Sequence, residues 1–247
     1  MVRNLLKRGR KLIRRLRDDW RLRRELRRRR ARNRHRTPAD VFTEIYTTNM
    51  WGGKPGELFS GLGSTGTAAS DYVATINHFI RQRGIRSVLD IGCGDFAIGQ
   101  KLDCADYTGV DVVPLVIERN QAEFGSDRRR FICLDAAGDG VLPAADLCLV
   151  RQVFQHLSNA QIANVLRKLK AFQFVIVTEH YPADKDFVAA NLDKVHGPDT
   201  RAYSGSGVYL DRPPYNLRTE LLLDCPGSST AGGVHGRGSI RTYLVIP

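Results

Sequence analysis

Residues 87–97, Ser-Val-Leu-Asp-Ile-Gly-Cys-Gly-Asp-Phe-Ala, decide the fold of this chain. A short apolar run leads into a turn that contains Gly92 and Gly94, and residues 97–103 then have a helical pattern. We expect glycine at this turn because a chain that bends sharply from a strand into a helix can bring bare backbone against a ligand. The stretch therefore predicts the first strand and the ligand-binding turn of an α/β fold.

A second buried strand follows at residues 107–113, Tyr-Thr-Gly-Val-Asp-Val-Val. It places Asp111 about 20 residues beyond Asp90, the spacing at which a carboxylate meets ribose hydroxyls in nucleotide-binding α/β folds. The two strands together predict a cofactor that contains a nucleoside.

Acidic residues around the turn indicate which nucleoside cofactor is bound. The string Gly92-x-Gly94-x-x-Ala97 fits the dinucleotide pattern formally. However, Asp90 precedes the turn and Asp95 lies at the expected helix entrance, so a pyrophosphate there would meet two carboxylates in a low dielectric. S-adenosylmethionine has no phosphate and carries an ammonium and a sulfonium. The charge therefore favours S-adenosylmethionine over a nicotinamide cofactor.

The motif Leu89-Asp-Ile-Gly-Cys-Gly94 resembles the first motif of the class I S-adenosylmethionine-dependent methyltransferases, and the resemblance extends over residues 88–177. It implies a Rossmann-like α/β fold, a mostly parallel sheet with helices on both faces. Phe96 stands where many members have a further glycine, and we expect it to narrow the loop at the methionine end of the cofactor. The chain is most similar to bacterial members of unsettled substrate, some of which look like glycan-tailoring enzymes.

The resemblance also implies where the cofactor contacts the strand ends. Asp111, at the end of the second strand, is expected to bind the ribose hydroxyls. Asp135, after the third strand, is expected to accept the adenine amino group, and the backbone N–H of Ala136 to contact the adenine ring. The cofactor-binding residues expected in all are Asp90, Gly92, Gly94, Asp95, Asp111, Val112, Asp135, Ala136 and Arg151.

Three residues after the fourth and fifth expected strands are candidates for catalysis, namely His156, Glu179 and His180. Methyl transfer depends mainly on holding donor and acceptor together in a dry pocket, and a hydroxyl acceptor also needs a base. Gln152 stands where relatives tend to carry an acid, which removes an obvious base. A structural role remains open for each candidate.

Other side chains have possible roles outside the strands. Aromatic residues could shield the sulfonium by cation–π contact, and two loop arginines could bind an anionic acceptor, although core and surface positions are the commoner outcomes. These residues are Tyr46, Trp51 and Phe96, and Arg201 and Arg212. Pro213-Pro214-Tyr215 is interpreted as a rigid turn rather than an amino-methylating motif.

The positive charge of the chain is confined to its first residues. The net charge is +12, but residues 1–36 hold 18 Lys and Arg and 3 acids, a balance of +15. Subtraction from the totals of 38 and 26 leaves 20 basic and 23 acidic residues for 37–247, a balance of −3. The catalytic domain is therefore mildly acidic, and its charge does not call for nucleic acid.

The basic arm, residues 1–36, has an apolar stripe at helical spacing: Val2, Leu6, Ile13, Leu16 and Trp20. We expect an amphipathic helix of about 20 residues followed by a disordered tether, because the arginines of residues 27–34 repel one another. Three interpretations of the arm remain open: it binds an anionic membrane surface, which the apolar stripe favours, it binds RNA, or it has no dedicated partner.

The rest of the chain divides into an N-terminal helical cap, residues 37–86, and a cofactor domain, residues 87–247. Strands are expected near 87–91, 107–112, 130–134, 146–150, 173–178 and 240–246, and helices near 67–83, 97–103, 114–124 and 158–171, besides a short one that starts at Thr37. The five cysteines lack disulfide or metal-ligand spacing, so we expect a reducing compartment and no metal.

These observations favour a cytoplasmic S-adenosylmethionine-dependent methyltransferase that O-methylates a small molecule or glycan, with the arm on the cytoplasmic membrane face. No apolar run approaches the ~20 residues of a membrane span. Two alternatives stay open: an RNA or ribosome methyltransferase that uses the arm as a grip, and a cofactor-binding protein whose catalytic site has decayed.

Overall fold

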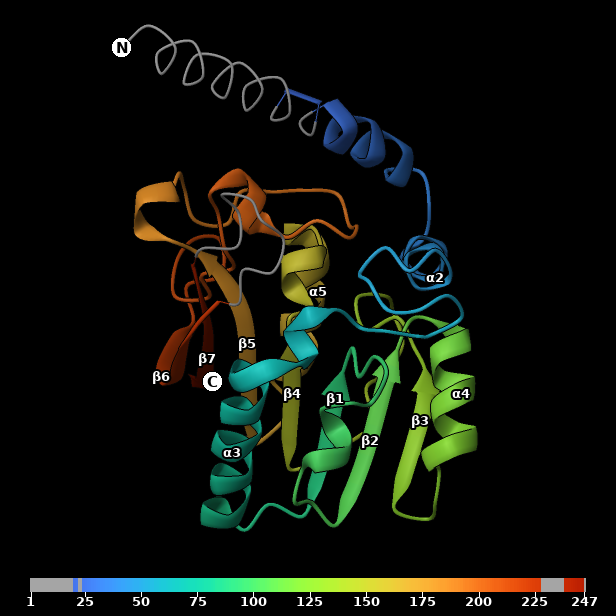
Figure 1. Ribbon diagram of the computed structural model, residues 1–247. Coiled ribbons are helices and arrows are strands. Elements are labelled where there is room, and N and C mark those ends of the chain that lie inside the picture. The colour runs from blue at the N-terminus through green and yellow to red at the C-terminus, as the bar shows by residue number, and fades with distance from the viewer. Residues whose placement is uncertain (1–19, 22–23, 228–237, 247) are drawn as a thin grey trace, which may run out of the picture.

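The computed structural model describes residues 20–21, 24–227 and 238–246. In this part of the chain a seven-stranded sheet has the order β3-β2-β1-β4-β5-β7-β6 (Figure 1). The strands are β1 (Ser87–Ile91), β2 (Asp106–Asp111), β3 (Arg129–Cys133), β4 (Leu147–Arg151), β5 (Phe174–Pro182), β6 (Arg218–Pro226) and β7 (Gly238–Ile246). Only β7 runs antiparallel to its neighbours β5 and β6, so the mostly parallel sheet predicted from the sequence is confirmed.

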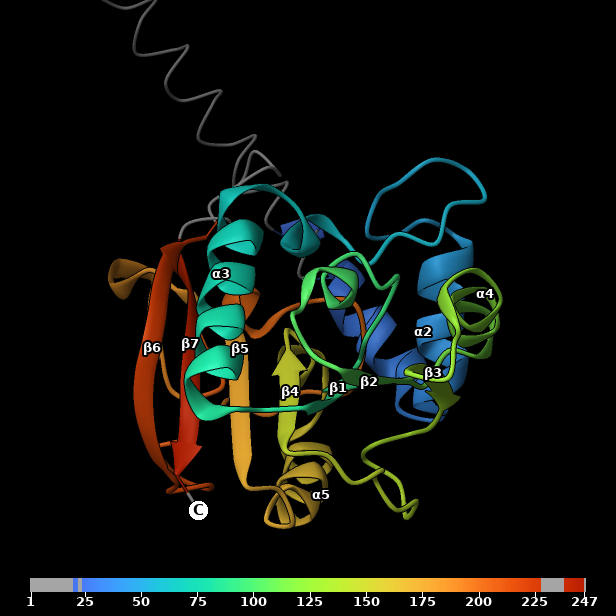
Figure 2. The same ribbon diagram turned by 90° about the horizontal axis from the view of Figure 1, so that it is seen from below.

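Helices cover both faces of this sheet, as expected. They are α2 (Pro38–Thr47), α3 (Gly66–Arg83), α4 (Pro114–Phe124) and α5 (Asn159–Leu169). Figure 2 shows α3 and α5 on opposite sides of the strands. Alternation along β4 serves both layers: Leu147 and Leu149 pack in the cluster that contains α3, whereas Cys148 and Val150 pack in the cluster that contains α5. The central strands are therefore buried on both faces.

Local sequence explains where these helices start and stop. The Thr37 side chain accepts a hydrogen bond from the Asp40 N–H, which caps α2 in front of Pro38. Ser158 forms a capping box with Gln161 at the start of α5. Gly84 ends α3 in the left-handed conformation, with a φ of 64°.

Two elements differ from the sequence expectation. The helix expected at 97–103 is a single 3-10 turn at Gly99–Lys101, because Phe96 still has a left-handed φ of 64° and delays helical geometry. The strand β6 was not expected, since the apolar run that forms it lies in a tail rich in glycine and proline. It pairs along its length with β7 and so completes the sheet.

The prediction of a disordered tether over residues 27–34 is wrong for residues 27–33, because residues 24–33 are helical; these residues are called the arm helix below. One side of the arm helix faces the domain: Asn33 is buried, and Arg30 forms an ion pair with Asp199. This neutralising partner offsets the repulsion on which the expectation rested. The apolar stripe lies outside the described residues except for Trp20. No helix in the described part is long and apolar enough to span a bilayer.

We expect Ser158→Ala to lower the free energy of unfolding by about 1 kcal/mol, because it removes the Ser158 hydroxyl that accepts the Gln161 N–H, whereas the Ser158 N–H that donates to the Gln161 side chain is kept. Urea unfolding followed by circular dichroism would measure the change. Ser70→Ala is the matched control, since Ser70 is exposed inside α3 and caps nothing. Equal stability of the two variants would contradict the prediction.

Candidate functional site

A cavity lies at the carboxyl ends of β1, β2 and β4 and has a volume of about 1140 Å³ including its open mouth. Figure 1 shows these strand ends pointing toward α2 and the segment that follows it. All nine residues expected to bind a cofactor line this cavity: Asp90, Gly92, Gly94, Asp95, Asp111, Val112, Asp135, Ala136 and Arg151. Ligands bind at this edge in open parallel sheets.

The glycine turn after β1 forms one wall of the cavity. Gly92 and Gly94 have φ values of 71° and 53°, a region that a side chain disfavours. Space is also limiting, because a Cβ on Gly94 would lie 2.3 Å from Ser60 Oγ and one on Gly92 would lie 2.4 Å from Val153 Cγ2. The groups that approach the backbone closely at these two glycines are therefore side chains of the protein itself, Ser60 and Val153.

Ser60 joins the N-terminal cap to the glycine turn. Its Oγ accepts a hydrogen bond from the Asp95 N–H at 2.7 Å, and its own N–H donates to Asp95 Oδ2 at 3.0 Å. Tyr46 from α2 lies at hydrogen-bond distance, 2.9 Å, from the same hydroxyl. The cap is therefore fixed over the cavity rather than loosely attached.

Two further carboxylates stand at the ends of β2 and β3. Asp111 accepts hydrogen bonds from the backbone N–H groups of Gly94 and Val113, both at 3.1 Å, and burial raises its pKa. Asp135 accepts the Ala137 N–H at 2.8 Å. Backbone donors thus orient both side chains at the cavity wall.

Asp90 and Arg151 line the cavity from two adjacent strands, β1 and β4. Burial raises the pKa of Asp90 to about 6, and the Tyr107 hydroxyl donates to it at 2.7 Å. The Arg151 guanidinium lies 4.8 Å from the centre of the Tyr72 ring and donates to Gly63 O at 2.6 Å. Arg151 therefore ties the glycine-serine segment of the cap to β4.

Phe96 does not narrow the loop and does not line the cavity, contrary to expectation. Its ring is fully buried in the core beneath the turn, with centroids 5.0 Å from Tyr107, 5.2 Å from Phe124 and 4.9 Å from Phe131. The left-handed backbone turns the side chain away from the ligand side. The other two aromatic candidates, Tyr46 and Trp51, do line the cavity.

Of the three candidate catalytic residues, only His156 lines the cavity, next to Trp51 at a centroid distance of 5.3 Å. Its Nδ1 lies 3.1 Å from Gly197 O and its Nε2 lies 3.2 Å from Gln155 Nε2. Burial, with a contribution from the Lys194 charge, lowers the pKa of His156 to about 3. The imidazole is therefore neutral across the physiological range.

Glu179 and His180 lie outside the cavity. Glu179 is fully buried on β5 and accepts backbone N–H groups of Val153, Phe154 and Gln155 at 2.8–3.1 Å. Burial raises its pKa to about 8, and the three hydrogen bonds oppose that rise. Its position makes it an anchor for the turn after β4 rather than a base.

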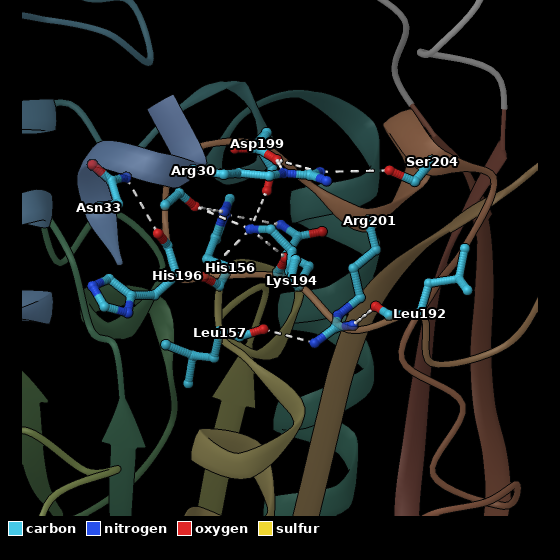
Figure 3. Close-up of polar contacts among 12 residues, drawn as sticks. Arg30, Asn33, His156, Leu157, Leu192, Lys194, His196, Asp199, Arg201 and Ser204 are labelled. Carbon is cyan, nitrogen blue, oxygen red and sulfur yellow. Dashed lines mark hydrogen bonds and ion pairs between the residues drawn. The ribbon is translucent and has the colours of Figure 1, made fainter. Parts of the chain in front are cut away.

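Lys194 and Arg201 organise the loop above His156, and sequence reasoning missed the first and misread the second (Figure 3). The buried ammonium of Lys194 donates to Asp199 O at 2.7 Å. Arg201 is 2% exposed and donates to the carbonyls of Leu157 and Leu192, so it does not face an anionic acceptor. Arg212 lies over Tyr209 and also misses the cavity. No single-residue signal in the sequence marks Lys194 as buried.

Charge is strongly biased within the cavity. Among the described residues its walls carry four carboxylates, Asp90, Asp95, Asp111 and Asp135, against one guanidinium, Arg151. The described residues contain no group of three or more acids, histidines or cysteines that could hold a metal ion. The cavity therefore suits a cationic ligand better than a polyphosphate.

The chain was compared with protein families, curated proteins and solved structures. No family model matches the chain, and no curated protein matches it in sequence. Among solved structures it is similar to the N-methyltransferase NodS from Bradyrhizobium japonicum WM9 in complex with S-adenosyl-L-homocysteine, with a TM-score of 0.58 and 15% identity over 84% of this chain and 100% of that one.

The chain has the class I methyltransferase fold. The magnesium protoporphyrin IX methyltransferase ChlM from Synechocystis PCC 6803, with bound S-adenosylmethionine, is a more distant neighbour, with a TM-score of 0.48 and 12% identity over 84% of this chain and 97% of that one. The cavity lies at the carboxyl edge of the sheet, and this is the edge at which the sequence predicted ligand binding.

We expect Glu179→Gln to lower the free energy of unfolding by about 1–3 kcal/mol, because its amide nitrogen would face a backbone N–H donor that now has a carboxylate acceptor. Urea unfolding measures this. His180→Gln is the control, since it changes the next residue on β5 without touching the turn. Lost turnover with unchanged stability in Glu179→Gln would instead indicate a catalytic role.

Proposed function

We propose that this protein is an S-adenosylmethionine-dependent methyltransferase. The observation that carries the proposal is the convergence of nine residues, expected from the sequence on separate strand ends, on one acidic cavity. Carboxylates stabilise the sulfonium and ammonium of this cofactor, whereas a pyrophosphate would be repelled. The fold supports the same assignment.

The polar residues of the cavity fit the parts of the cofactor. Asp111 would bind the ribose: each of its oxygens accepts one N–H and so keeps lone-pair capacity for a hydroxyl. Asp135 would accept the adenine amino group, with the Ala136 N–H at the ring. Asp90 and Asp95 would stabilise the charged methionine end, where Arg151 limits the excess of negative charge.

When bound, the cofactor would supply a methyl group on its sulfonium; the acceptor nucleophile would bond to this methyl carbon in line as the carbon–sulfur bond breaks and S-adenosylhomocysteine leaves. The chain contributes a dry and oriented pocket, and orientation is the larger part of such catalysis. The Trp51 ring lies 5.4 Å from Tyr46 and 6.1 Å from Phe42, so three aromatic side chains form one wall. Such a wall excludes water and stabilises a cation by cation–π contact.

We further propose that the acceptor is a hydroxyl of a small molecule or glycan, in a cytoplasmic setting near a membrane. The aromatic wall, with Gln152 and His156 beside it, has the composition of a small-molecule site, mostly apolar with a few polar groups. His156 is the candidate proton acceptor. Its low pKa makes it a weak base, so the rate would depend mainly on positioning.

We expect Asp111→Asn to weaken S-adenosylhomocysteine binding by roughly 10–100-fold, because one charge-assisted hydrogen bond contributes about 1.5–3 kcal/mol. Isothermal titration calorimetry would measure it. Asp106→Asn is a matched control at the other, exposed end of β2. Tight NADH binding without heat from S-adenosylhomocysteine would overturn the cofactor assignment.

Acceptor class is tested by incubating the protein with methyl-labelled S-adenosylmethionine and cell extracts that contain glycolipids, sugar nucleotides or RNA. We expect label in the glycolipid or sugar-nucleotide fraction, and less of it with His156→Gln, whose cofactor affinity should stay close to wild type. Label found only in RNA would reject the acceptor class while retaining the methyltransferase.

A further inference from the structure

The arm helix has a strongly cationic outer face. Residues 24–36 contain eight arginines and one acid, Glu25. The exposed arginines are Arg24, Arg27, Arg28, Arg32 and Arg34. Among the described residues, only Arg32 of these five has an acidic partner, Glu44 at 2.8 Å. The other four guanidinium groups, which form no ion pair with a carboxylate in the described part of the chain, create a positive surface that attracts polyanions.

The inner side of the arm is fixed to residues 196–199, called the latch below (Figure 3). Arg30 NH2 lies 2.9 Å from Asp199 Oδ2, whose side chain is only 3% exposed. Asn33 Nδ2 donates to His196 O at 3.2 Å, and His196 Nε2 lies 3.0 Å from Arg36 O. Contacts on both sides of His196 set the orientation of the outer face relative to the domain.

The latch also touches the wall of the cavity. Trp51 Nε1 donates to Pro198 O at 3.4 Å, and His156 Nδ1 lies 3.1 Å from Gly197 O. Lys194, from just before the latch, donates to Asp199 O and so stiffens it. Arm and cavity therefore share one four-residue segment, and both lie on the side of the sheet where the strands end (Figure 1).

We propose that the cationic outer face docks on a bilayer of anionic lipid, and that the latch holds the cavity mouth toward that bilayer, so that the acceptor is a membrane-borne molecule. The docking part rests on the arm alone, and the acceptor part rests on the proposed function. Basic residues near such a surface each contribute about 1 kcal/mol of attraction.

The features of the arm favour lipid over nucleic acid. Trp20, at the outer end, is 60% exposed, with the Arg24 guanidinium 5.4 Å from its ring centre. An exposed indole beside arginines is suited to a membrane interface. The acidic domain behind the arm would repel a long polyanion that wraps around it, whereas a bilayer needs to meet only one face.

The first experiment compares vesicle binding by two full-length triple variants of equal charge. Arg24→Gln/Arg27→Gln/Arg28→Gln alters the outer face, and Arg128→Gln/Arg130→Gln/Arg218→Gln alters exposed positions at the starts of β3 and β6. We expect the first to bind equimolar phosphatidylglycerol–phosphatidylcholine vesicles about 100-fold more weakly than wild type, and the second almost normally. Equal losses in the two variants would overturn the docking surface.

The second experiment tests the latch without any assumption about the reaction. Trp20→Phe leaves Trp51 as the only tryptophan of the chain. We expect vesicles to protect Trp51 from acrylamide quenching in this background, because the bilayer covers the cavity mouth. Adding Arg30→Gln should abolish the protection, whereas Arg29→Gln, whose partner is Glu25, should retain it. Unprotected Trp51 in vesicle-bound Trp20→Phe protein would overturn the proposed orientation.

S-adenosylhomocysteine calorimetry on the same proteins separates this proposal from the preceding one. Arm variants that lose vesicle binding should keep their affinity for S-adenosylhomocysteine. A wild-type protein that binds vesicles but no S-adenosylhomocysteine would contradict the methyltransferase and leave the docking surface standing. A single-stranded RNA that displaces the protein from vesicles at equal phosphate concentration would overturn the choice of lipid.

Discussion

The loops at the carboxyl edge of the sheet are held by carboxylates that accept backbone N–H groups. Asp111 fixes the glycine turn, Asp135 fixes the turn after β3, and Glu179 fixes three successive N–H groups after β4. A buried carboxylate costs less when several donors point at it, and a loop with satisfied N–H groups can stay close to the core. One type of interaction therefore both shapes the cavity and leaves it acidic.

The acidic cavity and the basic arm favour ligands of opposite charge. The chain has a net charge of +12, yet the cavity walls carry four carboxylates and one arginine, because the positive charge is concentrated before residue 37. At close range the cavity favours a cationic ligand, whereas the arm favours a polyanion. The net charge of the whole chain, taken alone, would have suggested an enzyme that acts on nucleic acid and would have hidden the acidic character of the cofactor site.

Much of the fold was predictable because its signals are local. The β1 strand, the glycine turn and the caps at Thr37 and Ser158 depend on neighbouring residues. The role of Glu179 was not predictable, because its three partners come from another strand end, about 25 residues away in sequence. Phe96 shows the same limit. The sequence shows a phenylalanine after the glycine turn, but the direction of its side chain depends on the left-handed backbone and on the aromatic core beneath the turn.

The arm shows why a charge pattern alone predicted disorder. Self-repulsion among arginines is real, but it is outweighed where the folded domain supplies a buried acid, and Asp199 is such an acid. Burial would raise the pKa of Asp199, yet Lys194 and Arg30 together lower it, so the carboxylate stays charged and keeps attracting the arm. Asp199 lies in the segment whose backbone carbonyls, at Gly197 and Pro198, contact His156 and Trp51 in the wall of the cavity. The arm and one wall of the cavity therefore contact the same four-residue segment.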